Sequence, residues 1–437
     1  MQANAPASQA VYHTETLTRV EGEGTLHLVV RGSDILDARF KIWEAPRYFE
    51  AFIVGRHPDE VVDIVARICG ICPIAYQMGA SYAFESIFGV QVDPQVRALR
   101  RLIYLGEWIE SHALHVYALH APDFLGYMSA IDLAKDHRAV VEQGLQLKKV
   151  GNDIMTVLGG RSVHPVSMRV GGFHRVPKRS EVDPLRARLE VALKQSLATL
   201  DFVAGLEAPP FERDVKLVSI RHPDEYGLID GRIISSDGEI DIAIPDWPKT
   251  FIEEQHEGTN ALHVRTKDGG LYLLGPSARV TNNHEQLHPV AKEALAKSGL
   301  LEGIRKNPFW SIAARSVELI HACAESMDII DAYRRPAQPY TPWTPQAGSG
   351  AWVTEAPRGI CSHNYTVDEK GLVTKAQIIA PTGPNQGSIE RDLALFAPQV
   401  LDLDHSAATW KLEQLIRCYD PCISCATHFL DLTIERV

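Results

Sequence analysis

The sequence predicts an α+β fold that is predominantly helical, with a central helix bundle and peripheral β segments. Three observations support this class. Several long stretches carry apolar residues at helical spacing, two stretches alternate polar and apolar residues as strands do, and 45% hydrophobic content over 437 residues is enough to bury a sizeable core.

The N-terminal part predicts a hairpin followed by a helix. In residues 24–44, alternating apolar residues flank a Gly-Ser-Asp turn at residues 32–34. Pro58-Asp59-Glu60 is typical of a helix start, and the apolar residues that follow run on to Cys69. The first cysteine pair is therefore expected at a helix end.

The central and C-terminal parts predict long helices separated by β segments. Helical spacing covers residues 94–116, 138–158, 184–204, 313–327 and 408–416. Between them, short alternating runs with an Asp-Gly turn predict a β-rich peripheral insertion over residues 213–282. Residues 336–350 are rich in Pro and Gly and predict an extended connection, and a second β segment follows to residue 381.

Charge and hydropathy exclude several classes of protein. The 55 acidic and 44 basic residues give a net charge of -11, so neither a nucleic acid nor an anionic membrane is an expected partner. No uncharged apolar run approaches the roughly 20 residues that span a bilayer. The first ten residues lack a basic segment followed by an apolar one, so we expect no export signal and no membrane span.

The seven cysteines are too sparse for a disulfide scaffold, and four of them form pairs. Cys69 and Cys72 make one C-x-x-C pattern, and Cys422 and Cys425 make another. The other three are isolated and are expected to be small buried apolar residues: Cys323, Cys361 and Cys418.

Paired cysteines indicate metal or redox chemistry. Thiolates are soft ligands, and a C-x-x-C turn lets both sulfurs face one ion. Zinc ribbons place their two pairs within roughly 20 residues of each other, whereas these pairs lie at opposite ends of the chain. A structural zinc site, a thiol-disulfide pair and a redox or catalytic metal all remain open at this point.

The residues around the cysteines resemble a known family. Residues 67–73 (RICGICP) and 420–428 (DPCISCATH) resemble the two signature motifs of nickel-iron hydrogenase large subunits. Residues 18–22 (TRVEG) and 355–359 (EAPRG) resemble the N-terminal motif and the arginine loop of that family. The resemblance implies one domain over residues 1–437, in which a central helical bundle brings the cysteine pairs together.

The resemblance also implies a reaction, the reversible heterolytic cleavage of H2 to protons and electrons. Cys72 and Cys425 would bridge nickel and iron, and Cys69 and Cys422 would bind nickel alone. The iron would carry cyanide and carbon monoxide. A terminal thiolate, for which Cys422 is the candidate, would accept the proton.

Four further residues are assigned to the same centre by resemblance. Arg358 would hang over the open metal position, whereas the alternative is a surface-loop arginine. Asp420 would accept a hydrogen bond from Arg358, against an alternative of Asp-Pro turn chemistry. Pro357 and Thr382 would flank the diatomic ligands, although the Gly-Pro after Thr382 departs from the usual pattern.

Proton transfer and a second cation complete the implied site. Glu21 would pass protons between the terminal cysteine and the exterior, and its alternative is an exposed charge. Glu50 and His428 resemble ligands of a buried Mg2+ or similar cation. We interpret the neighbouring histidines as packing or surface residues rather than ligands: His112, His115 and His120.

Two departures from membrane-linked relatives favour the soluble, bidirectional cytoplasmic branch. Tyr76 stands where those relatives have a histidine, and Ser111 where they have an aspartate. Only three cysteines remain after the four ligands, fewer than an iron-sulfur cluster takes. An iron-sulfur small subunit is therefore expected, with flavin- and NAD(P)-reactive subunits beyond it, because no Gly-x-Gly-x-x-Gly unit occurs here.

In most relatives a maturation protease removes the residues after the final histidine once nickel-insertion proteins have loaded the metal, so residues 429–437 are a candidate removable tail. Two alternative functions remain open at this point. One is an H2-sensing regulatory hydrogenase, and the other is a non-catalytic relative like the quinone-side subunit of complex I. Retention of all four cysteines argues against the latter.

Overall fold

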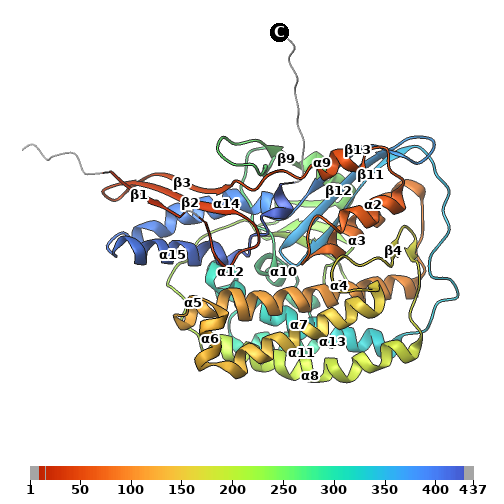
Figure 1. Cartoon of the computed structure of the whole chain (residues 1–437), viewed down its shortest axis with the longest axis horizontal. Coiled ribbons are helices and arrows are strands. Elements are labelled where there is room, and N and C mark those ends of the chain that lie inside the picture. Colours follow the sequence, from red (N-terminus) through yellow and green to blue (C-terminus); the bar gives the residue numbers. More distant parts are fainter. Residues whose placement is uncertain (1–8, 15, 428–437) are drawn as a thin grey trace, which may run out of the picture.

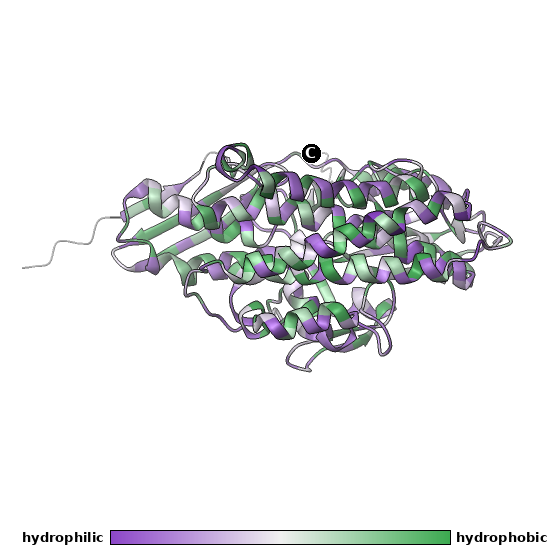
Figure 2. Ribbon diagram, turned by 90° about the horizontal axis from the view of Figure 1, so that it is seen from below, coloured by the Kyte–Doolittle hydropathy of each residue, from purple (hydrophilic) through white to green (hydrophobic). Residues whose placement is uncertain are grey.

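The computed structural model describes residues 9–14 and 16–427, which form a layer of long helices beneath several small antiparallel sheets (Figure 1). The long helices lie along the length of the molecule, and hydrophilic and hydrophobic residues alternate along them (Figure 2). Over this described part, no helix combines the length and the apolar character that crossing a bilayer requires.

The N-terminal sheet has the order β1-β2-β3, with bounds Gln9–His13, Gly24–Arg31 and Asp34–Ile42. The predicted hairpin is confirmed by β2 and β3, in which Leu26 pairs with Phe40. The apolar side chains of this sheet share a core with two late helices, α14 (Thr382–Phe396) and α15 (His405–Cys418). The two ends of the chain therefore meet in one layer.

Four helices form the bundle: α4 (Pro94–Leu114), α7 (Arg138–Gly159), α8 (Arg179–Ala204) and α13 (Ser311–Ala332). Each packs against two others, α4 and α8 both lying between α7 and α13. At the α4–α7 contact a Cβ on Gly151 would lie 2.4 Å from the Gly106 carbonyl oxygen, so only glycine allows this approach.

The prediction that α8 begins at Pro184 is wrong by five residues. The helix starts at Arg179, because the Glu181 carboxylate accepts a hydrogen bond from the Lys178 N–H (2.7 Å) and stabilises a turn before the proline. Pro184 therefore lies in the second turn of the helix rather than at its start.

The first cysteine pair lies between two early helices, α2 (Pro58–Val65) and α3 (Pro73–Phe88), and α1 (Phe49–Ile53) precedes them. The α3 helix packs on β11 (Gly348–Ala356) and β12 (Gly359–Val367), which with β13 (Val373–Ile379) form a second three-stranded sheet. The predicted second β segment is thus a sheet that supports the cysteine-bearing helix.

Residues 213–282 contain five short strands: β6 (Val218–Arg221), β7 (Arg232–Ser235), β8 (Asp241–Ala243), β9 (Phe251–Glu254) and β10 (His263–Thr266). The apolar side chains of these strands pack with Val353, Ile360 and Ile379 of the second three-stranded sheet. The division of the chain into one domain with an insertion at these bounds stays a prediction.

Short elements connect these parts. The α-helices are α5 (Ala121–Leu125), α6 (Ala130–Asp136), α9 (Trp247–Thr250), α10 (Pro276–Asn283), α11 (Pro289–Ser298) and α12 (Leu301–Lys306). A π-helical turn, η1 (His115–His120), follows α4. The 3-10 turns are η2 (Ile244–Asp246), η3 (His284–Gln286), η4 (Pro308–Trp310), η5 (Ala397–Gln399) and η6 (Ser424–Ala426), and β4 (Met168–Arg169) pairs with β5 (Gly172–Phe173).

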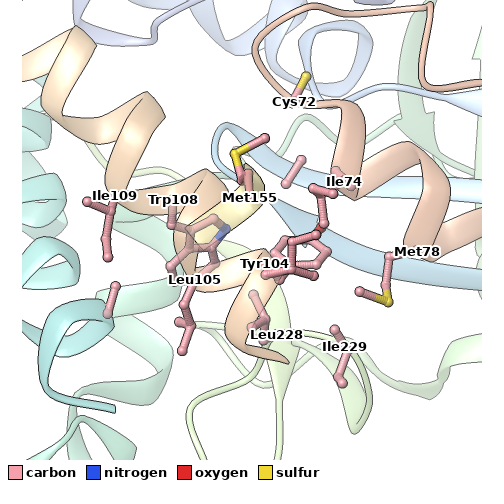
Figure 3. Packing of buried hydrophobic residues seen from close by; sticks show 14 of the residues in the cluster. Cys72, Ile74, Met78, Tyr104, Leu105, Trp108, Ile109, Met155, Leu228 and Ile229 are labelled. Atoms are coloured by element: carbon pink, nitrogen blue, oxygen red, sulfur yellow. The ribbon is translucent and has the colours of Figure 1, made fainter. Parts of the chain in front are cut away.

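The largest core includes the four paired cysteines, and Figure 3 shows Cys72 beside buried apolar side chains of this core. Trp108 and Tyr104 of α4 are fully buried there, with Ile74 and Met78 contributed by α3. The three isolated cysteines are all buried, as predicted: Cys323, Cys361 and Cys418.

Candidate metal centre

The two cysteine pairs converge on one point although 353 positions separate them. Cys69 Sγ lies 3.5 Å from Cys422 Sγ, and Cys72 Sγ lies 3.6 Å from Cys425 Sγ. All four sulfurs lie within 4.8 Å of one another, and each residue is at most 4% exposed. This is a compact, dry set of four soft donors.

The first pair is organised by the helix that follows it. Cys72 is the N-cap of α3, and Pro73 occupies the first helical position, where its missing N–H costs nothing. Cys69 Sγ accepts hydrogen bonds from the Ile71 and Cys72 N–H groups at 3.3 and 3.4 Å. Glu107 of α4 accepts from the first α3 amides, including that of Ile74 at 2.6 Å.

The second pair is held by segments that are remote in sequence. Cys422 forms a parallel β-bridge with Glu21, and the Ile423 N–H donates to the Glu21 carbonyl (3.0 Å). Thr382 Oγ1 donates to the Cys422 carbonyl at 2.9 Å and accepts from the Cys422 N–H at 3.1 Å. Both backbone groups of Cys422 therefore depend on one threonine hydroxyl.

Arg358 and Asp420 form a buried pair beside the sulfurs, each 2% exposed. Arg358 Nε donates to the Asp420 carbonyl (2.8 Å), and Nη2 donates to its carboxylate (3.1 Å). Arg358 Nη1 has no hydrogen-bond partner among residues 9–14 and 16–427. Despite burial, the Asp420 carboxylate and the nearby cysteines raise the pKa of Arg358, which is therefore charged.

Asp420 adopts a left-handed backbone conformation (φ 52°), which aspartate tolerates better than most residues. Its second carboxylate oxygen lies 3.7 Å from Arg315 Nη2. Burial lowers the pKa of Arg315 to about 10, so a second cation is present at this carboxylate at neutral pH. The Asp-Pro step is thus the meeting point of two arginines rather than a simple turn.

Glu21 links the sulfurs to a more open region. Its Oε2 accepts from the Cys422 thiol (3.3 Å) and from the Ser424 N–H (3.0 Å). Burial raises the pKa of Glu21 above its ordinary value, and the nearby Cys69 adds to the effect. The residue is half-buried, so it is neither an exposed charge nor sealed from solvent.

The four thiols do not all ionise when no metal is bound. Hydrogen bonds from Cys422 and the other two cysteines lower the pKa of Cys69, whereas burial raises the pKa of Cys422. One thiolate can thus be stabilised in the pocket, but further ionisation requires a cation. The donor set therefore fits a thiophilic metal that replaces the protons.

The side chains at the two positions of departure each carry a buried hydroxyl. Ser111 Oγ and Tyr76 Oη are buried and accept or donate no hydrogen bond within the described ranges. Burial raises the pKa of Tyr76, and the nearby Cys425, Cys361 and Cys72 add to the rise. Tyr76 therefore lies near the sulfurs as a neutral side chain.

Glu50 lies in α1 and accepts a hydrogen bond from the Ile378 N–H (2.6 Å). Burial raises the pKa of Glu50 to about 8, and the neighbouring Glu253 adds to the rise. A buried carboxyl with a raised pKa suits a cation site, because a bound cation would stabilise its ionised form. The second predicted ligand, His428, lies outside the described residues, as does the predicted tail over 429–437.

Sequence reasoning missed four residues that organise the site. Arg47 Nη2 donates to the carbonyls of Ile68 (2.6 Å) and Ser424 (2.5 Å) and so ties the two cysteine loops together. The others are buried ionisable residues: Glu107, Arg279 and Arg315. Only Arg47 had a usable signal, its place three residues before Glu50.

The three histidines interpreted as packing residues are all buried with protein partners. His112 Nε2 lies 2.8 Å from Glu318, His115 Nε2 lies 2.9 Å from the Arg417 carbonyl, and His120 Nε2 lies 3.5 Å from Cys418 Sγ. They are therefore packing residues and not surface residues. Each contacts a different protein group, so the three do not converge on one metal position.

Outside the four cysteines, His222, Glu225 and Asp230 also bring their ligand atoms within 4.8 Å of one another. Arg97 contacts both carboxylates, and Arg101 contacts Glu225 as well. These guanidinium groups already neutralise the acids, so this group is an ion-pair cluster and not a cation site.

Comparisons with known proteins agree with this geometry. The family model described as nickel-dependent hydrogenase matches residues 47–144 and 275–428, more than half of the chain. The chain belongs to the nickel-dependent hydrogenase family. Within that family it is a catalytic large subunit, an oxidoreductase whose four-cysteine cluster is the nickel-iron site.

Hydrogenase subunits of an archaeon are similar over almost their whole length. The chain is 32% identical to sulfhydrogenase 1 subunit alpha of Pyrococcus furiosus, covering 95% of this chain and 97% of that protein. It is 30% identical to sulfhydrogenase 2 subunit alpha of the same organism, covering 97% and 100%. Being subunits, these relatives indicate that hydrogenase large subunits work with partner subunits.

Solved structures share the fold. A crystal structure of an NAD+-reducing NiFe-hydrogenase in the H2-reduced state has a TM-score of 0.88 and 26% identity, covering 97% of this chain and all of that chain. A NiFeSe-hydrogenase of Dm. baculatum has a TM-score of 0.78 at 24% identity, covering 96% and 100%. The predicted hydrogenase large-subunit fold is therefore confirmed.

Proposed function

We propose that this hydrogenase subunit cleaves H2 heterolytically and reversibly at a nickel-iron centre held by its four paired cysteines. The observation that carries the proposal is the convergence of four buried sulfurs within 4.8 Å beside an arginine with one unused donor. A structural metal would need the sulfurs but not the arginine.

Cys72 and Cys425 would bridge nickel and iron, and Cys69 and Cys422 would bind nickel alone. When bound, the centre, with cyanide and carbon monoxide on iron, would supply the two-electron redox chemistry that no side chain here can perform. The protein would supply four thiolates, whose softness suits nickel and iron, and a pocket that excludes water.

Arg358 would hold dihydrogen and polarise it. Asp420 fixes its guanidinium through Nε and Nη2, so that Nη1 is the free donor. A planar, permanently charged group that is already oriented loses little entropy when it acts. Pro357, immediately before it, would add apolar contact to the diatomic ligands.

Protons would leave through Cys422 and Glu21. The Cys422 thiol already donates to Glu21 Oε2 at 3.3 Å, and burial raises the pKa of that carboxyl, which favours its uptake of a proton. Because Glu21 is half-buried, its other side reaches toward solvent.

Thr382 would act mainly on Cys422. Its single hydroxyl hydrogen is directed at the Cys422 carbonyl, so a hydrogen bond to a cyanide would require the hydroxyl to rotate. We therefore propose that Thr382 positions the backbone of Cys422 first and contacts a diatomic ligand only second.

Glu50 would bind Mg2+ or a similar cation together with His428. Glu50 Oε1 is held by the Ile378 amide, and a cation would offset the cost of ionising a carboxyl whose pKa is about 8. Residues 429–437 would be removed by a maturation protease after nickel-insertion proteins have acted, and mass spectrometry of the active subunit would test this. An intact Val437 in active enzyme would contradict it.

Electrons would pass to an iron-sulfur small subunit and then to flavin- and NAD(P)-reactive subunits in the cytoplasm. The support is the 26% identity to an NAD+-reducing NiFe-hydrogenase together with Tyr76 and Ser111 at the two positions of departure. Co-purification of the subunits and assay of NAD(P)+ reduction with H2 would test this acceptor.

Metal analysis with infrared spectroscopy tests the centre itself. We expect nickel and iron in equal amounts, with cyanide and carbonyl stretching bands, and zinc alone would overturn the proposal. Cys72→Ser and Cys425→Ser should each abolish H2 turnover. Cys323→Ser, a matched change at a buried cysteine outside the site, should leave turnover near wild type.

A further inference from the structure

A fully buried ion-pair network lies behind the arginine loop. Arg279 of α10 donates to both carboxylate oxygens of Glu318 in α13, each at 2.7 Å. It also reaches Glu355 of β11 at 3.1 Å, and its guanidinium carbon lies 4.3 Å from the centre of the Trp108 ring. Arg279, Glu318 and Glu355 are 0% exposed.

The same guanidinium holds the backbone of the loop that carries Arg358. Arg279 Nη1 donates to the Ala356 carbonyl (2.8 Å), and Nη2 donates to the Pro357 carbonyl (2.9 Å). These are the two residues directly before Arg358. All five N–H donors of Arg279 thus have acceptors, two of them loop carbonyls.

The loop is a tight turn with few backbone groups of its own to hold it. Residues 357 and 358 form the tight connection between β11 and β12, where Ala356 pairs with Gly359. Gly359 has a φ of 130°, which favours glycine. Pro357 has no N–H, so the rest of the protein can hold the turn mainly through hydrogen bonds to its carbonyl oxygens.

The anchor of the network is Glu318. Besides Arg279 it contacts His112 Nε2 (2.8 Å) and accepts from the Tyr226 hydroxyl (2.8 Å). Arg279 and His112 keep the pKa of Glu318 below its ordinary value despite burial, so it is ionised and pairs with Arg279. Helix α13 also carries Arg315, which contacts Asp420 on the other side of Arg358.

We infer that Arg279, fixed by Glu318, is a positioning residue that sets where the Arg358 guanidinium lies over the four-sulfur site. The inference rests on the proposed role of Arg358. Hydrogen bonds to Asp420 fix the side chain of Arg358. Hydrogen bonds from Arg279 fix the backbone of the two residues directly before it. Displacing the loop carbonyls would misalign the free Nη1 donor without touching any metal ligand.

A double-mutant cycle in the assembled holoenzyme tests the inference, with H2 turnover expressed per bound nickel. Arg279→Lys keeps the charge but cannot reach Glu318 and two carbonyls together, and we expect about a tenfold loss, or about 1.4 kcal/mol. In an Arg358→Lys background, the same change should cost less than about twofold, because the group it positions is already altered.

Two further variants keep the test decisive if Arg279→Lys folds poorly. Tyr226→Phe removes only the hydroxyl that holds Glu318, and we expect a smaller loss per nickel that also vanishes in the Arg358→Lys background. Arg100→Lys removes the bidentate geometry of the buried Arg100–Glu85 pair, which is far from the loop in sequence, and should lower stability but not turnover per nickel.

A purely structural role for Arg279 would give the same loss in both backgrounds, or no loss per nickel, and either result overturns the inference. Wild-type turnover in Arg358→Lys alone would instead contradict the proposed role of Arg358, and with it this inference. Absence of nickel and iron from the wild-type protein would contradict the proposed centre. The three failures are therefore distinguishable.

Discussion

Two arginines at this site are equally buried but differ in how their donors are used. Arg279 has acceptors for all five N–H groups, whereas Arg358 leaves Nη1 without one in the part of the chain that the structure describes. An unused donor in the interior costs free energy and persists only where something else uses it. Arg279 therefore uses all its donors within the protein, whereas Arg358 has a donor left for a ligand.

The same contrast holds for the acids around them. The Glu318 carboxylate is hydrogen-bonded to Arg279, His112 and Tyr226, so its charge is fully compensated. Asp420 accepts from Arg358, but its second oxygen has only a 3.7 Å contact with Arg315. Satisfied polar networks stabilise a fold, and incompletely satisfied ones mark the place where a ligand belongs.

The largest expected effect comes from removing the satisfied arginine. Arg279→Met would leave Glu318 and Glu355 buried without their counter-ion, and we expect a loss of about 3–5 kcal/mol in the free energy of unfolding. Chemical denaturation of the isolated subunit measures it. A change below about 1 kcal/mol would contradict the claim that this network is structural.

The second prediction concerns the unsatisfied arginine. Arg358→Lys should lower H2 turnover per nickel about 100-fold, equivalent to about 2.7 kcal/mol, because a lysine cannot use Asp420 and present a second oriented donor at once. Its thermal stability should stay close to wild type. Equal losses of stability in Arg358→Lys and Arg279→Lys would remove the distinction between the two residues.

The third prediction tests the backbone of Cys422. Thr382→Val keeps the side-chain shape but leaves the Cys422 N–H and carbonyl without their shared partner, and we expect a loss of about 1–3 kcal/mol in stability. Thr382→Ser, which retains the hydroxyl, is the matched control and should recover most of it. If serine and valine behaved alike, the hydroxyl would not be the cause.

The fourth prediction is a pH dependence within the satisfied network. One guanidinium serves two carboxylates, and burial, together with the charge of Glu318, raises the pKa of Glu355 to about 7. The folded state then binds more protons than the unfolded state between about pH 4.5 and 7, so stability falls as pH rises through this interval. Glu355→Gln should flatten that slope in thermal unfolding, and an unchanged slope would assign it to another group.

Much of the fold was predictable because its signals are local. Alternation and a turn at residues 32–34 predicted β2 and β3, and helical spacing predicted α4, α7, α13 and α15. The start of α8 was not predicted, because a capping carboxylate outweighed the usual meaning of a proline. Local patterns give the existence of an element more reliably than its ends.

The candidate site divides in the same way. The cysteine pairs, Arg358, Glu21 and Asp420 stand in short motifs that can be read directly. Arg279, Arg315 and Glu107 stand outside any such motif, in segments with helical signals, where a charged residue most often faces water. Nothing near them in the sequence distinguishes a buried arginine from an exposed one.

The sequence by itself determined the donor atoms, since two C-x-x-C patterns and an EAPRG string specify four thiols and one guanidinium whatever the path of the chain. Only the tertiary structure decided which donors remain unused, because that depends on acceptors between 39 and 78 positions away for Arg279 and 62 positions away for Arg358. Hydrogen-bond satisfaction is a property of the packed interior, where water cannot supply a missing partner.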